Sequence, residues 1–383
     1  MKICDVVLNS VWNDPRVTKQ VVEYIKAGFE VACVGMKYKN FNQEKINAMP
    51  CKVVMLERDA TFGGKQKSIL KKLLREKYRI ASVVQAIVNE KPDVIHANDL
   101  DALIPSYIAQ KKLGCKLIYD SHEICCETRY YDKYWIYNQY MKYTERRIVK
   151  KCDKMICVSH SAADYFHKAF KIEKPLVITN CILKENVLTE YPSKNEGFEV
   201  LNHGILHDSR GLEMMRDSCR FFEEYPEIKM AARGYGGIEK QLKEQVANDH
   251  LKNFIFYPPV DPKMLIPDAA RSHVGVAVTL PVCLNFKLSV SNRLFEYAAA
   301  GIPVIMSDIP EHRYLNDKYQ FGIIIENNEQ QAFEAAVLRL YNDKEFYMQC
   351  CCNAAKLATD VSWEREFAPL IAYLKDIESD RNE

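Results

Sequence analysis

The sequence predicts an α/β protein built from two doubly wound parallel sheets in tandem. Short apolar runs typical of buried strands alternate with helical segments along almost the whole chain, which is the pattern of a parallel sheet covered by helices on both faces. A polar, turn-rich stretch at residues 190–197 interrupts this alternation and predicts a domain boundary. The length of 383 residues is enough for two domains of ordinary size.

The first series of elements covers the amino-terminal half. A strand at residues 3–8 leads to a loop, after which Asp14 is expected to cap a helix that runs to Gly28. Pro15 then lies in the first turn of that helix, where its missing amide costs nothing. The other expected strands are 30–36, 51–56, 93–97, 116–120, 154–158 and 176–179, and the other expected helices are 65–90, 136–152 and 162–170.

The second series follows the polar break, so we expect one domain over residues 1–185 and another over 186–360. The carboxyl-terminal helix, 361–383, is expected to return to the first domain. The expected strands are 198–202, 228–232, 253–257, 274–278, 302–306 and 322–326, and the expected helices are 329–341, 344–358 and 363–377.

Unusual polar residues gather where the predicted strands end. They are Asp14, Arg16, Asn98, Asp99, Asp120, His122, His203 and Arg210. Ligands of doubly wound sheets bind beyond the carboxyl ends of the strands. This clustering therefore predicts a cleft between the two domains.

The stretch SNRLFEYAAAGIPVIMSD, residues 291–308, predicts a short helix followed by a buried strand. Ser291 or Asn292 can cap the helix through a side-chain oxygen, and Gly301 is placed to end it in the left-handed conformation. Glu296 is the lone acid on this helix. It either complements the positive end of the helix dipole or accepts hydrogen bonds from a pair of ligand hydroxyls, and spacing alone favours neither.

Composition excludes several classes of function. A net charge of +2 does not suggest nucleic-acid binding by the chain as a whole, and no apolar run approaches membrane-spanning length. The opening residues lead directly into a strand, so we expect no signal peptide. A cytoplasmic protein is therefore expected. The 14 cysteines show no C-x-x-C spacing, which predicts reduced thiols rather than a zinc site or a disulfide framework.

Five segments occur in order along the chain: DPRV after the first strand, VIHANDLDAL, YDSHE, CDKMICVS and SNRLFEYAAAGIPVI. Together they resemble family 4 of the retaining glycosyltransferases. The last is similar to the family's N-K-x-F-E-Y-x-A-x-G-x-P-V-I segment and is the most specific match. The resemblance covers almost the whole chain and implies the GT-B architecture, in which two Rossmann-like domains face each other across a cleft.

The resemblance implies a donor site in the second domain. Glu296 matches the acid that binds the ribose hydroxyls of a nucleotide sugar. Arg210 matches the basic residue that neutralises the leaving diphosphate, and Gly204 the glycine of the family's G-R pair. The loop before Glu296 would place amides and a cation near the pyrophosphate, through Lys287, Ser291, Asn292 and Arg293.

The resemblance also implies roles in the first domain. His122 matches the histidine that contacts the transferred sugar, and Asp14 and Arg16 lie in the loop that faces donor phosphates and acceptor. Three departures concern the donor side. Leu288 stands where many members have a second glutamate, Ile205 replaces the arginine of G-R, and the loop after the first strand lacks the frequent Gly-Gly.

Each assignment has a structural alternative. His122 could be a histidine at the core edge satisfied by Asp120 or a carbonyl, and Arg210 could form a surface ion pair with Asp208 or Glu213. Arg233, in a glycine-rich turn, is better explained by turn chemistry than by nucleotide binding.

The basic segment 65–79 also has two readings. It is more often a solvated helix face than a membrane patch, and a weak contact with an anionic membrane is the alternative.

We therefore expect a metal-independent hexosyltransferase that retains anomeric configuration and acts in polysaccharide or glycolipid assembly. Metal independence is expected because no D-x-D signature stands in the matching context. The nucleotide-sugar donor and a glycan or lipid-linked acceptor are the expected partners, with no cofactor, no nucleic acid, and a location in the cytoplasm or at the inner face of the membrane. A nucleotide-sugar epimerase of the same fold and a non-catalytic binding module are the alternatives.

Overall fold

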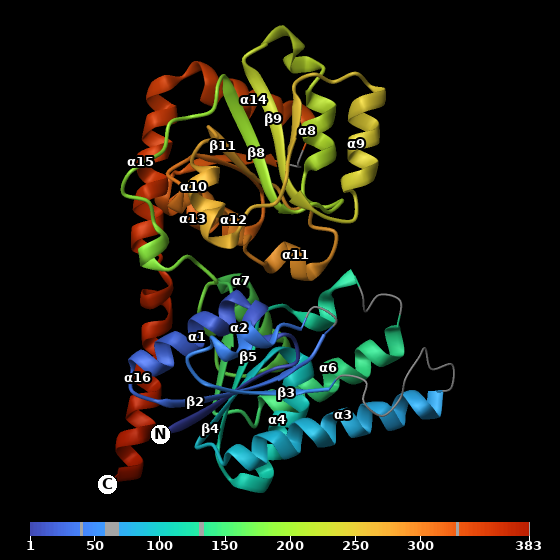
Figure 1. Ribbon diagram of the computed structural model, residues 1–383, viewed down its shortest axis with the longest axis vertical. Coiled ribbons are helices and arrows are strands. Elements are labelled where there is room, and N and C mark those ends of the chain that lie inside the picture. The colour runs from blue at the N-terminus through green and yellow to red at the C-terminus, as the bar shows by residue number, and fades with distance from the viewer. Residues whose placement is uncertain (39–40, 58–68, 130–133, 327–328, 383) are drawn as a thin grey trace. The chain divides into compact units, whose positions relative to one another are not determined.

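The computed structural model describes residues 1–38, 41–57, 69–129, 134–326 and 329–382 (Figure 1). The chain divides into two compact units. Unit 1 comprises Met1–Ile178 and Arg365–Glu383, and unit 2 comprises Thr179–Glu364. The chain thus leaves unit 1 before the polar break at residues 190–197 and returns to it within the last helix.

Unit 1 contains a parallel sheet of seven strands within the described residues, in the order β3-β2-β1-β4-β5-β6-β7. The order reverses direction between β1 and β4, because the chain first builds outward to one edge and then to the other. The central strands are buried on both faces, which explains their continuous apolar runs. The strands are β1 (Lys2–Val7), β2 (Glu30–Met36), β3 (Lys52–Leu56), β4 (Val94–Asn98), β5 (Lys116–Ser121), β6 (Lys154–Cys157) and β7 (Leu176–Val177).

Helices cover this sheet, and α3 lies beside α4 (Figure 1). Asp14 caps α1 as expected, accepting hydrogen bonds from the amides of Arg16 and Val17, and Pro15 is the first helical residue. The helices of this unit are α1 (Pro15–Lys26), α2 (Gln43–Asn47), α3 (Ile69–Glu90), α4 (Asp99–Leu113), α6 (Trp135–Val149), α7 (His160–Phe170) and α16 (Trp363–Asn382), with 3₁₀ helices η1 (Val11–Asn13) and η2 (Cys125–Glu127).

Unit 2 contains a second parallel sheet, with six strands in the described residues in the order β10-β9-β8-β11-β12-β13. The order reverses direction between β8 and β11, so the carboxyl ends of these two strands border the crevice where ligands of open α/β sheets bind. The strands are β8 (Phe198–Ile205), β9 (Ile228–Tyr235), β10 (Phe254–Tyr257), β11 (Val274–Ala277), β12 (Val304–Ser307) and β13 (Gly322–Ile325).

In this unit α12 contacts α10 and α15, and α8 contacts α14 (Figure 1). The helices are α8 (Leu212–Ser218), α9 (Glu239–Asn248), α10 (Leu265–Ala269), α11 (Leu284–Leu288), α12 (Asn292–Ala299), α13 (Pro310–Tyr319), α14 (Gln330–Asn342) and α15 (Lys344–Asp360), with 3₁₀ helices η3 (Lys184–Asn186), η4 (Phe221–Glu224) and η5 (Pro262–Met264). The two sheets and their helices confirm the predicted pair of doubly wound, Rossmann-like domains.

The last helix, α16, begins in unit 2 and lies for most of its length on unit 1. Phe367 packs edge-on against the buried ring of Tyr24, with 5.3 Å between ring centroids. The amino group of Met1 lies 2.5 Å from the Glu378 carboxylate, and Arg381 lies 2.6 Å from Asp93. Ring packing and ion pairs therefore hold the carboxyl-terminal helix against the start of the chain.

All the cysteines fall within the described ranges, and none is joined to another in the structure. Across the described part of the chain, no helix combines the length and apolar character needed to cross a membrane.

Candidate functional site

The candidate site in unit 2 lies at the carboxyl end of β8, opposite α12. Glu296 projects from α12, and its Oε2 lies 2.7 Å from Nε2 of His203 on β8. The His203 side chain is 1% exposed, whereas that of Glu296 is 20% exposed. A buried histidine thus holds one oxygen of a carboxylate that still reaches the surface.

Tyr297, the residue after Glu296, fixes His203 in turn. Its ring stacks on the imidazole with centroids 4.4 Å apart. Its hydroxyl accepts a hydrogen bond from the His203 amide and donates one to the Leu201 carbonyl, each at 3.0 Å. The Glu296 helix and strand β8 are therefore connected through four adjacent contacts.

The start of α12 differs in detail from the expectation. Ser291 is the N-cap, but its side chain makes no capping hydrogen bond, and Asn292 is the first helical residue rather than a cap. The predicted side-chain cap is therefore wrong. The Ser291 hydroxyl lies 3.4 Å from Nε of Arg293 instead. No side-chain oxygen of the N-cap thus competes for the first-turn amides of α12, and such amides attract anions.

Arg293 is buried, and its guanidinium binds backbone and side-chain oxygens of unit 2. Nη1 donates to the Val276 carbonyl and to Oδ1 of Asn202, each at 2.9 Å, and Nη2 donates to the Val278 carbonyl at 2.8 Å. Burial first, and then the charge of Arg210, lower the pKa of Arg293 to about 10. These contacts give Arg293 a positioning role at the ends of β8 and β11, and its contact with a diphosphate stays a prediction.

Two other predicted donor residues, Arg210 and Gly204, lie at the same strand ends. Arg210 lies close enough to Arg293 to influence its pKa, and the Arg210 carbonyl accepts a hydrogen bond from Asn202 at 2.8 Å. Gly204 has a φ of +107° where β8 ends, and a Cβ on neighbouring Gly234 would lie 1.9 Å from the Gly204 oxygen. Lys287 is exposed in the last turn of α11.

Arg233 is held by contacts within unit 2, as expected from a structural role in the turn. Its Nε lies 2.6 Å from Oδ2 of Asp268, Nη1 donates to the Pro258 carbonyl at 3.1 Å, and the guanidinium stacks over the Tyr257 ring. These contacts account for the charge of Arg233 within unit 2.

In unit 1 the polar residues meet at the carboxyl ends of β1, β4 and β5. His122 lies just after β5, with Nε2 3.1 Å from Oδ1 of Asn98 and Nδ1 3.4 Å from Oδ2 of Asp99. Its side chain is 15% exposed. Burial alone lowers the pKa of His122, but the carboxylates of Asp99 and Asp120 outweigh that effect and raise the pKa to about 9. The imidazole is therefore a protonated donor at neutral pH.

Arg16 anchors the neighbouring carboxylate. Its Nε and Nη2 each donate to an oxygen of Asp120 at 2.9 Å, and its Nη1 donates to the Ile178 carbonyl at 2.8 Å. Burial alone would raise the pKa of Asp120, but the charges of Arg16 and His122 hold it well below its usual range. Arg16 thus orients a buried carboxylate, and Asp14 caps the same helix with an additional hydrogen bond from Asn9.

Asp99 occupies a strained backbone position beside this group. Its φ of +64° is uncommon for a residue other than glycine and costs on the order of 1–3 kcal/mol. In this conformation Oδ1 accepts a hydrogen bond from the His122 amide at 2.9 Å, while Oδ2 lies near the His122 ring. Asp99 therefore helps to fix both the backbone and the side chain of His122.

The predicted residues thus form two groups, one in each unit. Arg16 and His122 meet at Asp120, and Glu296, Arg293, Arg210 and Gly204 surround the ends of β8 and β11. Sequence reasoning placed His203 and Asp99 at strand ends but gave neither a role. Their positions at the ends of β8 and β4 were the only signal, because their partners are distant in sequence.

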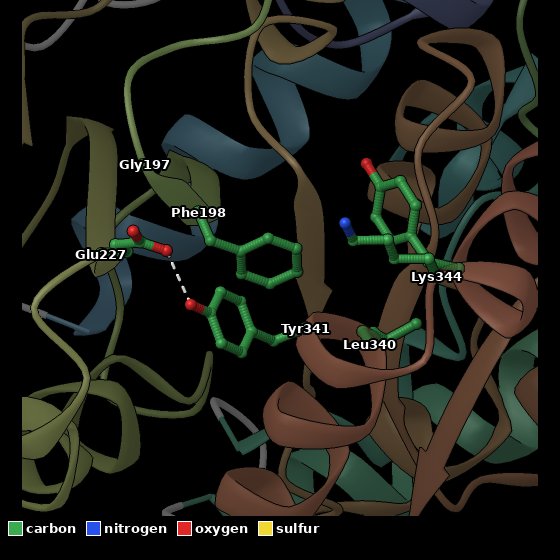
Figure 2. Close-up of a pocket in the computed structure, with 7 residues that line it drawn as sticks. Gly197, Phe198, Glu227, Leu340, Tyr341 and Lys344 are labelled. Carbon is green, nitrogen blue, oxygen red and sulfur yellow. Dashed lines mark hydrogen bonds between the residues drawn. The ribbon is translucent and has the colours of Figure 1, made fainter.

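A cavity of about 330 Å³ lies at the opposite end of the unit 2 sheet, where β8 begins (Figure 2). Phe198 and Tyr341 lie side by side in it, and the Tyr341 hydroxyl donates to Glu227 at 2.6 Å. Since ligands of these sheets bind at the carboxyl ends of the strands, this cavity is separate from the candidate site.

Two protein families match the chain in sequence. Residues 16–183 match the family described as Glycosyltransferase Family 4, and residues 197–343 match Glycosyl transferases group 1. Among the curated proteins no match was found.

Solved structures share the fold at low sequence identity. Sucrose-phosphate synthase from Thermosynechococcus elongatus is 13% identical, with a TM-score of 0.78 over 99% of this chain and 100% of that one. HepE from Anabaena in complex with UDP and glucose is 16% identical, with a TM-score of 0.76 over 98% of this chain and 100% of that one. A point mutant of TarM from S. aureus in complex with Fondaparinux, alpha-GlcNAc-glycerol and UDP is 11% identical, with a TM-score of 0.72 over 97% and 99%.

The structural likeness establishes the fold, and the two sequence matches assign glycosyltransferase domains to the two halves of the chain. Together they identify this chain as a glycosyltransferase of the GT-B type.

Proposed function

We propose that the chain transfers a hexose from a UDP-sugar to a glycan or lipid-linked acceptor, with retention of anomeric configuration. The observation that carries this proposal is the Glu296 carboxylate, held by buried His203 beside the start of α12. HepE and TarM bind UDP, which supports uracil as the base. Polysaccharide or glycolipid assembly in the cytoplasm is the process that we assign to it.

Glu296 would recognise the ribose of the donor. A carboxylate accepts hydrogen bonds from two adjacent hydroxyls, and hydrogen bonding to a charged group contributes about 1.5–3 kcal/mol. Because His203 Nε2 lies 2.7 Å from Oε2, we place a proton on that nitrogen. The donated hydrogen bond fixes the carboxylate before the nucleotide arrives.

The leaving diphosphate would meet positive potential from two sources. The amides of the first turn of α12 carry partial positive charge, and Arg210 adds a full charge near the same strand ends. Exposed Lys287 of α11 would add a second charge. As the bond between sugar and diphosphate breaks, negative charge grows on the leaving oxygens, so donors aimed at them stabilise the transition state. Arg293 would support this site indirectly, by holding Asn202 and the end of β11.

In unit 1, His122 would contact the transferred sugar. A protonated imidazole can donate a hydrogen bond to a sugar hydroxyl, and Asp99 and Asp120 keep it protonated. Asp14 and Arg16 would act through the loop and through Asp120. We also propose that transfer is independent of divalent metal, since arginine and helix amides can stabilise the diphosphate. Activity that persists in excess EDTA supports this, and loss restored by Mg²⁺ or Mn²⁺ contradicts it.

The decisive test incubates the protein with a panel of UDP-sugars, with and without a mixture of glycan and lipid-linked acceptors. Acceptor-dependent release of UDP supports transfer, and proton NMR of the product shows whether the anomeric configuration is retained. Release of UDP or a changed sugar without acceptor indicates the epimerase alternative. Nucleotide binding without turnover of any donor indicates the binding-module alternative.

Membrane contact through residues 65–79 stays a prediction. Residues 65–68 lie outside the described residues, and the structure describes no side chain of residues 69–73.

A further inference from the structure

Helix α6 of unit 1 presents a row of exposed aromatic and aliphatic side chains. Trp135 is 70% exposed, Ile136 78% and Tyr140 62%, and Tyr137 and Tyr143 are also more than half exposed. Ile136, Tyr140 and Tyr143 are separated by four and three positions, so they share one face of the helix. Large side chains exposed together in this way mark an interaction surface rather than a solvated helix.

The opposite face of α6 is firmly attached to unit 1. Met141 and Ile148 are buried, and Glu145, which is 1% exposed, accepts a hydrogen bond from the Tyr119 hydroxyl at 2.7 Å. The aromatic row is therefore not a core face that lacks its partner. The helix buries one face by ordinary packing and exposes a second apolar face.

The charges that α6 itself exposes are all positive, and one of them, Lys142, lies 2.7 Å from Glu127 of η2. Arg147, Lys150 and Lys151 are exposed along the carboxyl-terminal half of the helix and just beyond it, and Arg146 is partly exposed. Glu145 is the single acid between residues 134 and 151, and it points into unit 1. Arg147 also donates to the Tyr143 hydroxyl at 3.0 Å, so the aromatic and basic parts of the surface are continuous.

We propose that this face of α6 docks on an anionic lipid surface. Tryptophan and tyrosine favour the boundary between lipid headgroups and acyl chains because each joins an apolar ring to a polar tip. The neighbouring cations match the negative charge of such a surface. A second copy docked through the same face would bring the same cations, and a glycan would leave the aliphatic Ile136 without a suitable partner.

The experiment measures partition of the whole chain onto vesicles of phosphatidylcholine alone and of equimolar phosphatidylcholine and phosphatidylglycerol. Binding to the anionic vesicles that weakens with added salt is expected. Brominated acyl chains should quench Trp135, since Trp363 is fully buried and Trp12 partly buried. The Trp135→Phe variant should lose most of this quenching while it still binds.

Two variants test the two parts of the surface. Ile136→Ser with Tyr140→Ser should lower partition by roughly tenfold or more, because two apolar side chains leave the lipid boundary. Arg147→Gln with Lys150→Gln should lower it by about fivefold for each charge at low salt. The matched controls are Tyr314→Ser and Lys240→Gln in unit 2, which should bind like the unchanged chain, and circular dichroism checks that each variant is folded.

Several results would overturn the proposal. They are equal partition onto neutral vesicles, no partition at all, and quenching that persists in Trp135→Phe. Dimerisation that Ile136→Ser with Tyr140→Ser abolishes would assign the face to a second copy, and protection of Trp135 from acrylamide by soluble glycans would assign it to carbohydrate. None of these measurements uses a sugar donor, so they are independent of the proposed transfer reaction.

Discussion

At the scale of single residues, Glu296 could be singled out from sequence and His203 could not. Glu296 is a lone acid on an apolar helix, which is a local signal. His203 lies 93 positions away and becomes significant only when β8 and α12 come together. The sequence likewise did not predict that Arg293 is bound within unit 2, because the carbonyls that accept its hydrogen bonds belong to β11 and the loop after it.

Replacing Glu296 with alanine should weaken UDP binding by roughly 1.5–3 kcal/mol, the range for hydrogen bonds to a charged group. Titration calorimetry measures this difference, and the melting temperature should barely change. Glu239→Ala, a partly exposed acid of α9, serves as the control. Unchanged affinity in Glu296→Ala would return this residue to the role of complementing the helix dipole.

His203 should matter through Glu296. His203→Ala should weaken UDP binding by about 1 kcal/mol, because the carboxylate loses the donor that orients it. In the Glu296→Ala background the same substitution should have almost no further effect, which a double-mutant cycle by calorimetry would reveal. Additive losses in that cycle would mean that His203 acts on the nucleotide site without Glu296.

Arg210 should contribute mainly to the transition state. Arg210→Ala should lower kcat by ~10²–10³, the effect of losing one preorganised donor, and should raise KM much less. Arg210→Lys should restore part of the rate, since lysine keeps the charge but cannot donate two parallel hydrogen bonds. Arg220→Ala, at an exposed site, is the control. A raised KM with unchanged kcat would limit Arg210 to holding the donor.

At the scale of elements, the local chemistry of helix ends explains which boundaries were predictable. Asp14 with Pro15, and Gly301 after its alanines, are strong local signals, and both ends formed as predicted. The start of α12 was not predictable, because Ser291 turns its hydroxyl toward Arg293, whose position depends on β8 and β11. A cap can therefore be read from sequence only where tertiary contacts do not compete for it.

Gly301 allows a test of this element. Its φ is +66°, and a Cβ there would lie 2.3 Å from the Tyr191 ring. Gly114 ends α4 with a φ of +70° and open space around it. Gly114→Ala should thus cost about 1–2 kcal/mol of stability for the left-handed backbone alone, and Gly301→Ala should cost clearly more in chemical unfolding. Equal losses would show that Tyr191 moves aside freely.

At the scale of the whole molecule, sequence predicted two wound sheets but not the strand order within them. The order decides which strand ends are neighbours, since β1 lies between β2 and β4 although 57 residues separate the end of β2 from the start of β4. That arrangement brings Asp120 to Arg16, 104 positions apart, and places both beside His122. This buried group of charges exists only in the folded unit, so it should make the stability of unit 1 depend on pH.

His122 makes that dependence testable. Its pKa is raised from 6.5 to about 9 by Asp99 and Asp120, against the opposing effect of burial. Protonated His122 therefore contributes stability that is fully present below pH 6.5 and is lost as the pH rises through about 9. The contribution is roughly 3 kcal/mol at most. Unfolding of unit 1 by urea should show this loss, and NMR titration of the imidazole should place its midpoint near 9.

The His122→Asn variant separates this linkage from the rest of the molecule. It should be less stable than the unchanged chain below pH 6.5, and its stability should vary much less between pH 6.5 and 9 because asparagine does not titrate. His167→Asn, at an exposed position of α7, should keep the original pH dependence. If the proposed sugar contact needs the charged imidazole, the transfer rate of the unchanged chain should fall through the same pH range. A titration midpoint at or below 6.5 would show that the two carboxylates do not outweigh burial, and it would remove the charged donor from the proposed mechanism.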